Sequence, residues 1–255
     1  MKQIMLTVAA GKRLIGKATA SHAAVVNALQ KGTVVIIAGT TNSYAAEEIL
    51  AATGRKDKFS RRRFFRGITL PPHYKINEAG RLTGESEFPG DVVIRDGIWQ
   101  EGKTINEVVA DLKEGDVIIK GANALDVVHK RAALLIGHPQ GGTITVALTA
   151  VIGRRVRLII PVGLEKRISG NFDEIANKVN VPGNTGYRFF PMQGEVISEI
   201  EALQLLSGVK AEMLAAGGIS GAEGCIWLNI EGPSEQIKAA EKLVQSLASE
   251  PPFIL

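Results

Sequence analysis

Short apolar runs rich in β-branched residues alternate with stretches of helical periodicity along most of this chain. The strand-like runs are residues 33–38 (TVVIIA), 116–119 (DVII), 132–136 (AALLI) and 157–161 (RLIIP). The helix-like stretches that follow them are residues 42–52, 124–131, 143–151 and 171–179. Apolar runs of this kind suit strands buried on both faces, which occur in parallel sheets covered by helices. The alternation therefore predicts an α/β fold with a Rossmann-like, mostly parallel sheet and helices on both faces.

A cluster of Pro, Gly and Asn at residues 181–186 (VPGNTG) interrupts the alternation and is the best boundary in the sequence. We expect a Rossmann-like ligand-binding domain over residues 1–186 and a small α+β domain over residues 187–255. In the second part, the patterns predict strands at 187–192, 209–216 and 225–231 and helices at 195–206 and 234–247. This βαββα order is typical of a ferredoxin-like sandwich. Within residues 55–103 the periodicity fades, so loops or a short hairpin that includes residues 91–94 are expected.

The 255-residue chain has a net charge of +4, but the charge is unevenly distributed. Residues 1–190 hold 27 Lys and Arg against 17 Asp and Glu, whereas residues 191–255 hold 3 against 9. A basic larger part favours an anionic small ligand, such as a phosphate ester, or a polyanion over a cationic or apolar ligand. With 45% hydrophobic and 22% charged residues, the composition excludes a disordered, collagen-like or disulfide-framework protein.

One cysteine and four histidines limit the chemistry further. Cys225 alone excludes an internal disulfide and a thiolate-rich metal site. The histidines show no ligand spacing, so we expect no metal site and no cofactor. The longest apolar stretch, residues 143–153, is too short to cross a membrane, and the first residues are too briefly apolar for a secretory signal. We expect a cytoplasmic protein with no membrane partner.

The sharpest local signal is the turn at residues 39–43, where an apolar strand stops and a helix starts. Its residues are Gly39, Thr40, Thr41, Asn42 and Ser43. Such a turn directs backbone N–H groups and small hydroxyls at one point, and the helix N-terminus adds partial positive charge, so it can bind a phosphate or carboxylate. The turn lacks the lysine of a P-loop and the three glycines of a dinucleotide site, so ATP and NAD gain no specific support. The alternative is a structural turn capped by Asn42 or Ser43.

A second turn, Lys120-Gly121-Ala122-Asn123, follows the strand at residues 116–119. Because loops at the carboxyl ends of parallel strands share one edge of the sheet, both turns should face the same crevice. Lys120 would supply a positive charge, Asn123 an oriented amide, and Asp126 a carboxylate able to act as a general base. The alternative for Asp126 is a residue at a helix start, where the dipole favours a negative charge.

The third turn, residues 137–143, follows the strand at residues 132–136 and precedes another helix-like stretch. Gly141 and Gly142 allow close approach of the backbone to a ligand, Thr143 follows them, and His138 would be placed at the same rim. A lone histidine in a loop is more often a hydrogen-bonded scaffold residue than an acid or base. We therefore expect Gly141, Gly142 and Thr143 as ligand contacts and treat catalysis by His138 as a hypothesis.

Residues 55–66 (RKDKFSRRRFFR) combine seven basic residues with three phenylalanines. Basic residues interleaved with aromatic rings can bind nucleic acid, because arginines neutralise phosphates and rings stack on bases. The alternative, which we favour, is a solvated segment whose aromatic residues anchor it to the core.

With these three turns described, the main part of the chain resembles the superfamily that groups ribose-5-phosphate isomerase, glucosamine-6-phosphate deaminase, CoA transferases, DeoR-type effector domains and methylthioribose-phosphate isomerase. Residues 39–43 stand in the place of that group's Gly/Thr/Ser phosphate loop, and residues 116–124 in the place of its strand followed by a Gly-Ala-Asp/Asn turn. The residues after 186 also resemble the small domain of ribose-5-phosphate isomerase. The resemblance implies a phosphorylated ligand and aldose–ketose isomerisation.

The chain also departs from this superfamily. The acidic turn of the isomerase is represented only by Ala122 and Asn123, and its glycine-rich lysine loop has no clear counterpart. Glu85 and Glu87 lack the context of a CoA-transferase nucleophile, and no helix-turn-helix precedes Lys12. The chain therefore resembles a stand-alone member with an altered site.

The leading hypothesis is a protein that binds a phosphorylated metabolite, either a sugar phosphate or a nucleotide-like molecule. If the ligand reacts, proton transfer beside a carbonyl suits the residues, with Asp126 as base, Lys120 or Asn123 stabilising the enediolate oxygen, and His138 assisting. The alternatives are a non-catalytic metabolite sensor or interaction protein and nucleic-acid binding through residues 55–66. We also expect a homo-oligomer.

Overall fold

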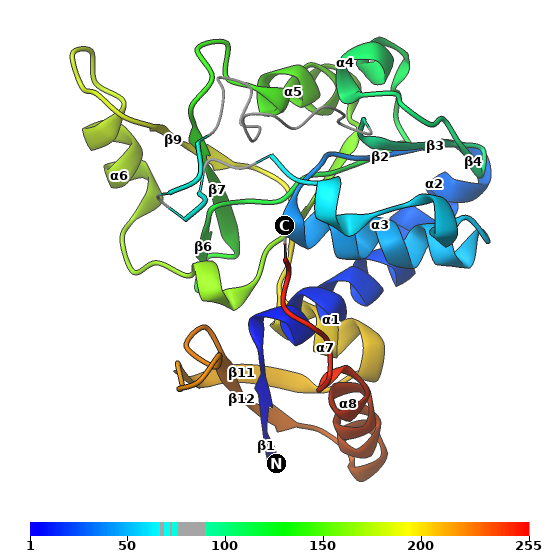
Figure 1. Ribbon diagram of the computed structural model, residues 1–255, viewed down its shortest axis with the longest axis vertical. Helices are drawn as coiled ribbons and strands as arrows, with labels where there is room; N and C mark the ends of the chain where they lie inside the picture. Colours follow the sequence, from blue (N-terminus) through cyan, green and yellow to red (C-terminus); the bar gives the residue numbers. More distant parts are fainter. Residues whose placement is uncertain (67–68, 72, 76–89, 255) are drawn as a thin grey trace.

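The main sheet has six strands in the order β10-β8-β5-β2-β3-β4 and is flanked by helices in a mixed α/β fold (Figure 1). The structure is a computed structural model that describes residues 1–66, 69–71, 73–75 and 90–254. The strands β10 (Glu195–Ile197), β8 (Arg157–Pro161), β5 (Val117–Ile119) and β2 (Thr33–Ile36) are parallel. The hairpin of β3 (Val92–Arg95) and β4 (Ile98–Trp99) extends the sheet antiparallel to β2. The strands expected at 33–38, 116–119 and 157–161 and the hairpin at 91–94 are confirmed.

Helices cover both faces of the main sheet. In Figure 1, α1 (Val8–Ser21), α2 (Ala23–Lys31) and α3 (Thr40–Ala52) lie on one side of it, and α4 (Ile105–Val108) and α5 (Thr143–Arg154) lie on the other. This cover explains why every residue of β2 and β5 is buried, because strands between two helical layers meet no solvent. No helix in the described ranges is both long and apolar enough to span a membrane.

Gly16 determines how closely α1 and α3 pack. A Cβ atom added at Gly16 would lie 2.8 Å from the backbone carbonyl carbon of Tyr44 and 3.0 Å from the amide nitrogen of Ala45. Only a residue without a side chain permits this approach of two helix backbones. The contact brings the start of α3, which follows β2, into a fixed position over the sheet.

A second, antiparallel sheet corrects one sequence-based prediction. Residues 124–131 are not a helix, because β6 (Ala124–Asp126) pairs with β7 (Arg131–Ile136), which in turn pairs with β9 (Arg188–Met192). The Asp126 carboxylate accepts a hydrogen bond from the His129 amide at 3.0 Å, and Lys130 adopts a left-handed conformation with φ of 51°. These two features close a tight turn between β6 and β7. Helix α6 (Phe172–Val179), expected at 171–179, packs beside β9.

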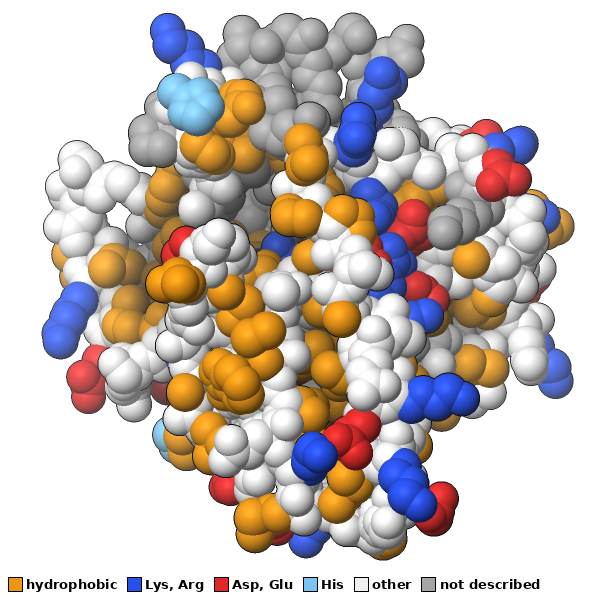
Figure 2. All heavy atoms as spheres, turned by 60° about the horizontal axis from the view of Figure 1, so that its bottom comes forward, with side chains coloured by type: hydrophobic (Ala, Val, Ile, Leu, Met, Phe, Trp, Pro, Cys, Tyr) orange, Lys and Arg blue, Asp and Glu red, His pale blue; other side chains and the backbone are white. Residues whose placement is uncertain are grey.

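A third sheet joins the two ends of the chain. The strand β1 (Lys2–Leu6) pairs with β12 (Ile226–Glu231), which also pairs with β11 (Lys210–Ala216). Helices α7 (Glu199–Ser207) and α8 (Ser234–Leu247) accompany this sheet (Figure 1). Met5 and Trp227 are register partners that are 41% and 39% exposed, and Figure 2 shows apolar side chains on the face of the molecule that lies at the bottom of Figure 1.

The expected βαββα unit is not formed from residues 187–255 alone. The strand near residues 187–192 is β9, which pairs with β7, and its expected place in the small sheet is taken by β1. The helix predicted at 195–206 begins only at Glu199, because residues 195–197 pair with β8 and Ser198 forms a capping box with Glu201. Strand pairing therefore crosses the boundary expected after Gly186 in both directions.

The basic segment is anchored to the body of the protein, as we favoured. It contains the short turns η1 (Lys56–Lys58) and η2 (Arg61–Arg63), after which Phe64 and Phe65 are buried. Arg61 forms ion pairs of 3.2 Å with both Glu47 and Glu250, and its guanidinium lies over the ring of Tyr44. Two further short turns are η3 (Val109–Asp111) and η4 (Leu164–Lys166).

Arg13 of α1 holds the C-terminal segment in place. Its side chain is 9% exposed and forms ion pairs with Glu47, Glu48 and Glu250. The first two carboxylates belong to α3, and the third follows α8. The chain therefore runs from α8 past α1 toward the main sheet, where Phe253 contacts Phe65 edge to face (Figure 1).

Candidate functional site

The turns that follow β2, β5 and β7 open into one cavity of about 1330 Å³. Twelve of the fourteen candidate site residues line it: Gly39, Thr40, Thr41, Asn42, Lys120, Gly121, Ala122, Asn123, His138, Gly141, Gly142 and Thr143. The first two turns meet because β2 and β5 are adjacent parallel strands whose carboxyl ends share an edge. The third turn arrives differently, since β7 belongs to the antiparallel sheet and leads into α5.

The structure does not bring Ser43 or Asp126 to the lining of this cavity. The Ser43 hydroxyl donates to the carbonyl oxygen of Thr40 at 2.7 Å, so it stabilises the first turn of α3. The Asp126 carboxylate lies in β6 and contacts the His129 ring at 2.8 Å. Burial alone would raise the pKa of Asp126, but the hydrogen bonds from His129 lower it. Asp126 therefore ends β6 and stabilises the turn to β7, and the alternative of a helix start at this residue is wrong.

The N-terminus of α3 faces the cavity without a side-chain cap. Neither Asn42 nor Ser43 caps the helix, which corrects the structural alternative considered for this turn. The Asn42 amide group instead donates to the carbonyl oxygens of Ile37, at 2.7 Å, and Ile119, at 3.3 Å, and so ties the end of β2 to the end of β5. The Thr41 hydroxyl is buried and has no hydrogen-bond partner among the described residues. The N–H groups of the first turn of α3 are therefore available to a ligand, whereas the Thr41 hydroxyl is buried beside them.

A second helix N-terminus reaches the same cavity. Gly141 and Gly142 precede α5 with φ of 79° and 68°, a left-handed conformation that favours glycine. The helix starts at Thr143 without a side-chain cap, and the Lys120 amine donates to the Thr143 hydroxyl at 3.1 Å. Lys120 thus connects the turn after β5 to the start of α5.

His138 lies at the rim with its ring orientation fixed. The Nδ1 atom of its ring accepts a hydrogen bond from the amide of Gln140 at 3.2 Å. In the neutral ring this arrangement assigns the proton to Nε2. The ring can therefore donate a hydrogen bond to a ligand from Nε2.

Lys120 has no carboxylate partner within ion-pair distance in the described part of the chain. Its side chain is half-buried, with the remainder open to the cavity, and burial together with the charge of Arg66 lowers its pKa from 10.5 to about 8. The negative charge of Asp91 opposes this shift. Asp91 is already engaged, because it accepts from the amides of Ala38 and Ile105 and pairs with Arg66 at 3.3 Å. A cation in such a place is stabilised by an anion that the ligand can supply.

The lining of the large cavity as a whole carries cationic side chains without acidic ones among the described residues. The cationic side chains are Lys12, Arg66, Lys120 and Lys166, and no Asp or Glu is present among the described lining residues. Apolar side chains form other parts of the wall: Phe65, Leu134, Ile144, Tyr187, Phe253 and Ile254. The cavity can therefore hold an anionic group together with an apolar or ring-containing body.

Sequence reasoning missed Lys166, Lys12 and the C-terminal residues of the wall. Lys166 follows β8, and the rule that pointed to the turns after β2 and β5 applies equally there. Lys12 lies in a helix and Phe253 near the chain end, and no local pattern marks either of them.

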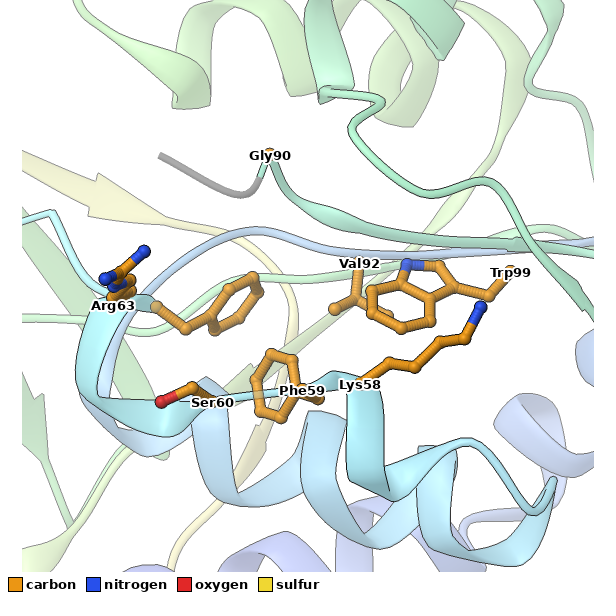
Figure 3. Close-up of a pocket in the computed structure, with 8 residues that line it drawn as sticks. Lys58, Phe59, Ser60, Arg63, Gly90, Val92 and Trp99 are labelled. Atoms are coloured by element: carbon orange, nitrogen blue, oxygen red, sulfur yellow. The ribbon is translucent and has the colours of Figure 1, made fainter. Parts of the chain in front are cut away.

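A smaller cavity of about 330 Å³ lies on the other side of the basic segment. Phe59, Val92 and Trp99 point toward one another in it, with Lys58 and Arg63 nearby (Figure 3). Lys58 pairs with Glu101 at 2.9 Å. Because Phe65 and Arg66 line the large cavity, residues of the basic segment contribute to the lining of both cavities.

The arrangement contains no evident metal centre. In residues 1–66 and 90–254, no three His, Cys, Asp or Glu side chains are grouped so that they could hold a metal ion. The functional assignment rests on this geometry alone, because comparison of the chain with family models, curated proteins and solved structures gives no match.

Proposed function

We propose that this protein binds a phosphorylated small metabolite in the large cavity. The observation that carries the proposal is Lys120, whose amine lies at the cavity beside the N-terminus of α5 without a carboxylate partner in the described structure. The N-terminus of α3 opens into the same cavity. Each helix N-terminus contributes about half a positive charge and free N–H donors, which suit the oxygens of a phosphate.

The size and lining of the cavity support a ligand larger than phosphate itself. A volume of about 1330 Å³ exceeds the 300–1,000 Å³ that is typical of small-molecule sites. The apolar wall around Phe65, Ile144 and Phe253 can cover the body of a sugar phosphate or a nucleotide-like ester.

One observation favours a non-catalytic sensor over an isomerase. Isomerisation requires a base beside the carbonyl, and the expected base, Asp126, does not line the cavity. The remaining acid–base groups are His138, with its proton on Nε2, and Lys120. Asn123 uses its carbonyl oxygen to accept from the Leu135 amide at 3.1 Å, which leaves its NH₂ group as a donor to a ligand oxygen. Proton transfer by His138 remains the catalytic alternative.

The wider assignments are proposals of the same kind. The strand–turn–helix at residues 33–52 supports membership of the superfamily of sugar-phosphate isomerases and CoA transferases. The four parallel strands of the main sheet support a Rossmann-like origin of that sheet. A ferredoxin-like origin of the small sheet, a cytoplasmic location and assembly into a homo-oligomer are also proposed. Nucleic-acid binding is less well supported, because Arg61 and Lys58 are engaged in ion pairs.

Valine substitutions of Thr40 and Thr41 test the proposed site. Because the Thr41 hydroxyl is buried without a partner in the described structure, Thr41→Val should leave the fold intact. Wild-type protein is screened by thermal shift against sugar phosphates, nucleotides and CoA esters, since a ligand that binds only the native state raises its stability. We expect the double variant to lose the shift.

Two controls complete this experiment. Thr149→Val changes an exposed hydroxyl of α5 that bonds only to the Val146 carbonyl, and Asp126→Ala changes the acid outside the cavity. Both should retain the ligand-induced shift. An unchanged affinity of the Thr40/Thr41 variant for every phosphorylated ligand would contradict the proposal. Turnover of the bound ligand, followed by NMR, distinguishes an isomerase from a sensor.

A further inference from the structure

A second cationic region lines the same cavity, away from the start of α3. It consists of Lys166, which ends η4 after β8, and Lys12, which lies in the first turns of α1. The Lys166 amine donates to the carbonyl oxygen of Ala122 at 2.7 Å, a neutral acceptor. Within the residues that the structure describes, neither lysine has a carboxylate within ion-pair distance.

The carboxyl groups behind these lysines do not cancel their charge. Glu199 is 2% exposed and accepts from the Leu164 amide at 2.8 Å, and the Oε1 atom of Glu165 is buried without a partner among described residues. Burial and the charge of Glu165 raise the pKa of Glu199, which weakens the negative charge that Glu199 can place behind the lysines. Neither carboxyl group lines the cavity, whereas both Lys12 and Lys166 do.

The sheet sets the separation between the two cationic regions. The strands β2, β5 and β8 are neighbours in that order, and the loops after them lead to Thr40, Lys120 and Lys166. Adjacent strands lie about 4.8 Å apart, so the loops after β2 and β8 are about 10 Å apart along the edge of the sheet, and the Lys166 side chain reaches from the loop after β8 to Ala122 in the loop after β5. The cavity volume of about 1330 Å³ leaves room for groups at both places at once.

We propose that Lys12 and Lys166 form a second anion subsite, so that the ligand carries two anionic groups. A phosphate binds between the helix N-termini at Thr41 and Thr143, and a second phosphate or a carboxylate binds one to two strand spacings away, at Lys12 and Lys166. This inference rests on the proposed function, since it names a narrower class of ligand for the same cavity.

A series of simple probes measures the contribution of the second anion. The probes are linear alkanediol bisphosphates of increasing chain length, the matching monophosphates, and ω-phosphorylated alkanoic acids, which carry a carboxylate in place of the second phosphate. Affinities for the wild-type protein are measured by calorimetry in phosphate-free buffer. We expect the bisphosphate of the best length to bind at least about tenfold more tightly than its monophosphate, because charge-assisted hydrogen bonds contribute that much.

Substitutions assign this gain to the two lysines. Lys12→Met and Lys166→Met should each weaken binding of the bisphosphate more than binding of the monophosphate, and Lys166→Arg, which keeps the charge, should retain most of the preference for the bisphosphate. Lys242→Met, on the exposed side of α8, is the matched control. The ω-phosphorylated alkanoic acids show whether the second subsite binds a carboxylate or requires a phosphate.

The outcomes separate this inference from the proposed function. Equal affinities of monophosphates and bisphosphates at every length would overturn the second subsite and leave the proposed function standing. A preference that persists in both Lys12→Met and Lys166→Met would overturn the assignment to these residues. Failure of every probe to bind the wild-type protein would contradict both proposals. If Lys166→Met does not fold, Lys12→Met and Lys166→Arg still decide the question.

Discussion

Replacing Lys120 with methionine should stabilise the empty protein while weakening its binding of anions. Methionine has nearly the same shape as lysine, so the change removes the charge and leaves the packing. The fall in the pKa of Lys120 from 10.5 to about 8 corresponds to about 3 kcal/mol of destabilisation while the amine is charged. Because part of the side chain is open to the cavity, water recovers some of this energy, and we expect Lys120→Met to gain about 2 kcal/mol at pH 7.

The pH dependence provides an independent check on this reasoning. The native pKa of Lys120 lies below its unfolded value, so the unfolded chain binds more protons between pH 8 and 10.5. The stability of the wild-type protein should therefore rise, relative to that of Lys120→Met, as the pH increases through this range. Conversely, the affinity for a phosphorylated ligand should fall above about pH 8 in the wild-type protein, as the amine loses its charge.

Calorimetric melting in phosphate-free buffer measures the first effect. A gain of about 2 kcal/mol raises Tm by about 4–8 °C in a protein of this size. Lys242→Met, which removes an exposed lysine of α8, should leave Tm unchanged. A lower Tm for Lys120→Met at pH 7, or a wild-type stability that does not rise above pH 8 relative to the variant, would refute the argument that Lys120 is a buried cation without a partner.

Two further predictions concern the contacts that hold the site together. Gly16→Ala should destabilise the protein by about 1–3 kcal/mol in urea denaturation, because its Cβ would meet the Tyr44 backbone. Gly153→Ala in α5 is the control, and it should be neutral or stabilising because no atom lies within 4 Å of the added Cβ. Equal effects of the two substitutions would exclude close packing as the cause. Arg13→Met should cost about 2–3 kcal/mol at pH 7, because Glu47, Glu48 and Glu250 each lose a charge-assisted hydrogen bond, although Arg61 and Lys17 still pair with these carboxylates. Burial alone would raise the pKa of Glu250, but Arg13 lowers it. The loss of stability in Arg13→Met should therefore be complete above pH 4.5 and become smaller as the pH falls below this value. A loss of stability that is independent of pH would contradict this account.

The sequence predicted the elements whose signals are local. The apolar strand predicted at residues 33–38 and the helix predicted at 42–52 depend on neighbouring residues, and the structure contains them as β2, which ends at Ile36, and α3, which begins at Thr40. The convergence of the turns after β2 and β5 also followed, because parallel neighbours have their carboxyl ends at one edge.

Elements that depend on distant pairing could not be predicted in the same way. Residues 124–131 have apolar residues compatible with a helix, but β7 pairs with β9, more than fifty residues further along the chain, and this pairing selects a hairpin. The small sheet needs β1, whose partner β12 is more than two hundred residues away. Asn42 was expected to contact a ligand, yet its amide bridges two carbonyl oxygens that only the folded sheet brings together.

Arg13 and Lys120 differ in whether the protein supplies a carboxylate to pair with the cation. Arg13 does not line the large cavity and is paired with three carboxylates, and Arg66, which does line it, pairs with Asp91. The three lysines of the cavity differ from these arginines, because Lys120, Lys12 and Lys166 find only neutral acceptors or none in the described structure, next to helix N-termini that add further positive charge. Such an arrangement lowers the stability of the empty protein, and it is relieved by an anion from outside. A substitution of Lys120 that raises the stability of the empty protein should therefore also lower its affinity for a phosphorylated ligand.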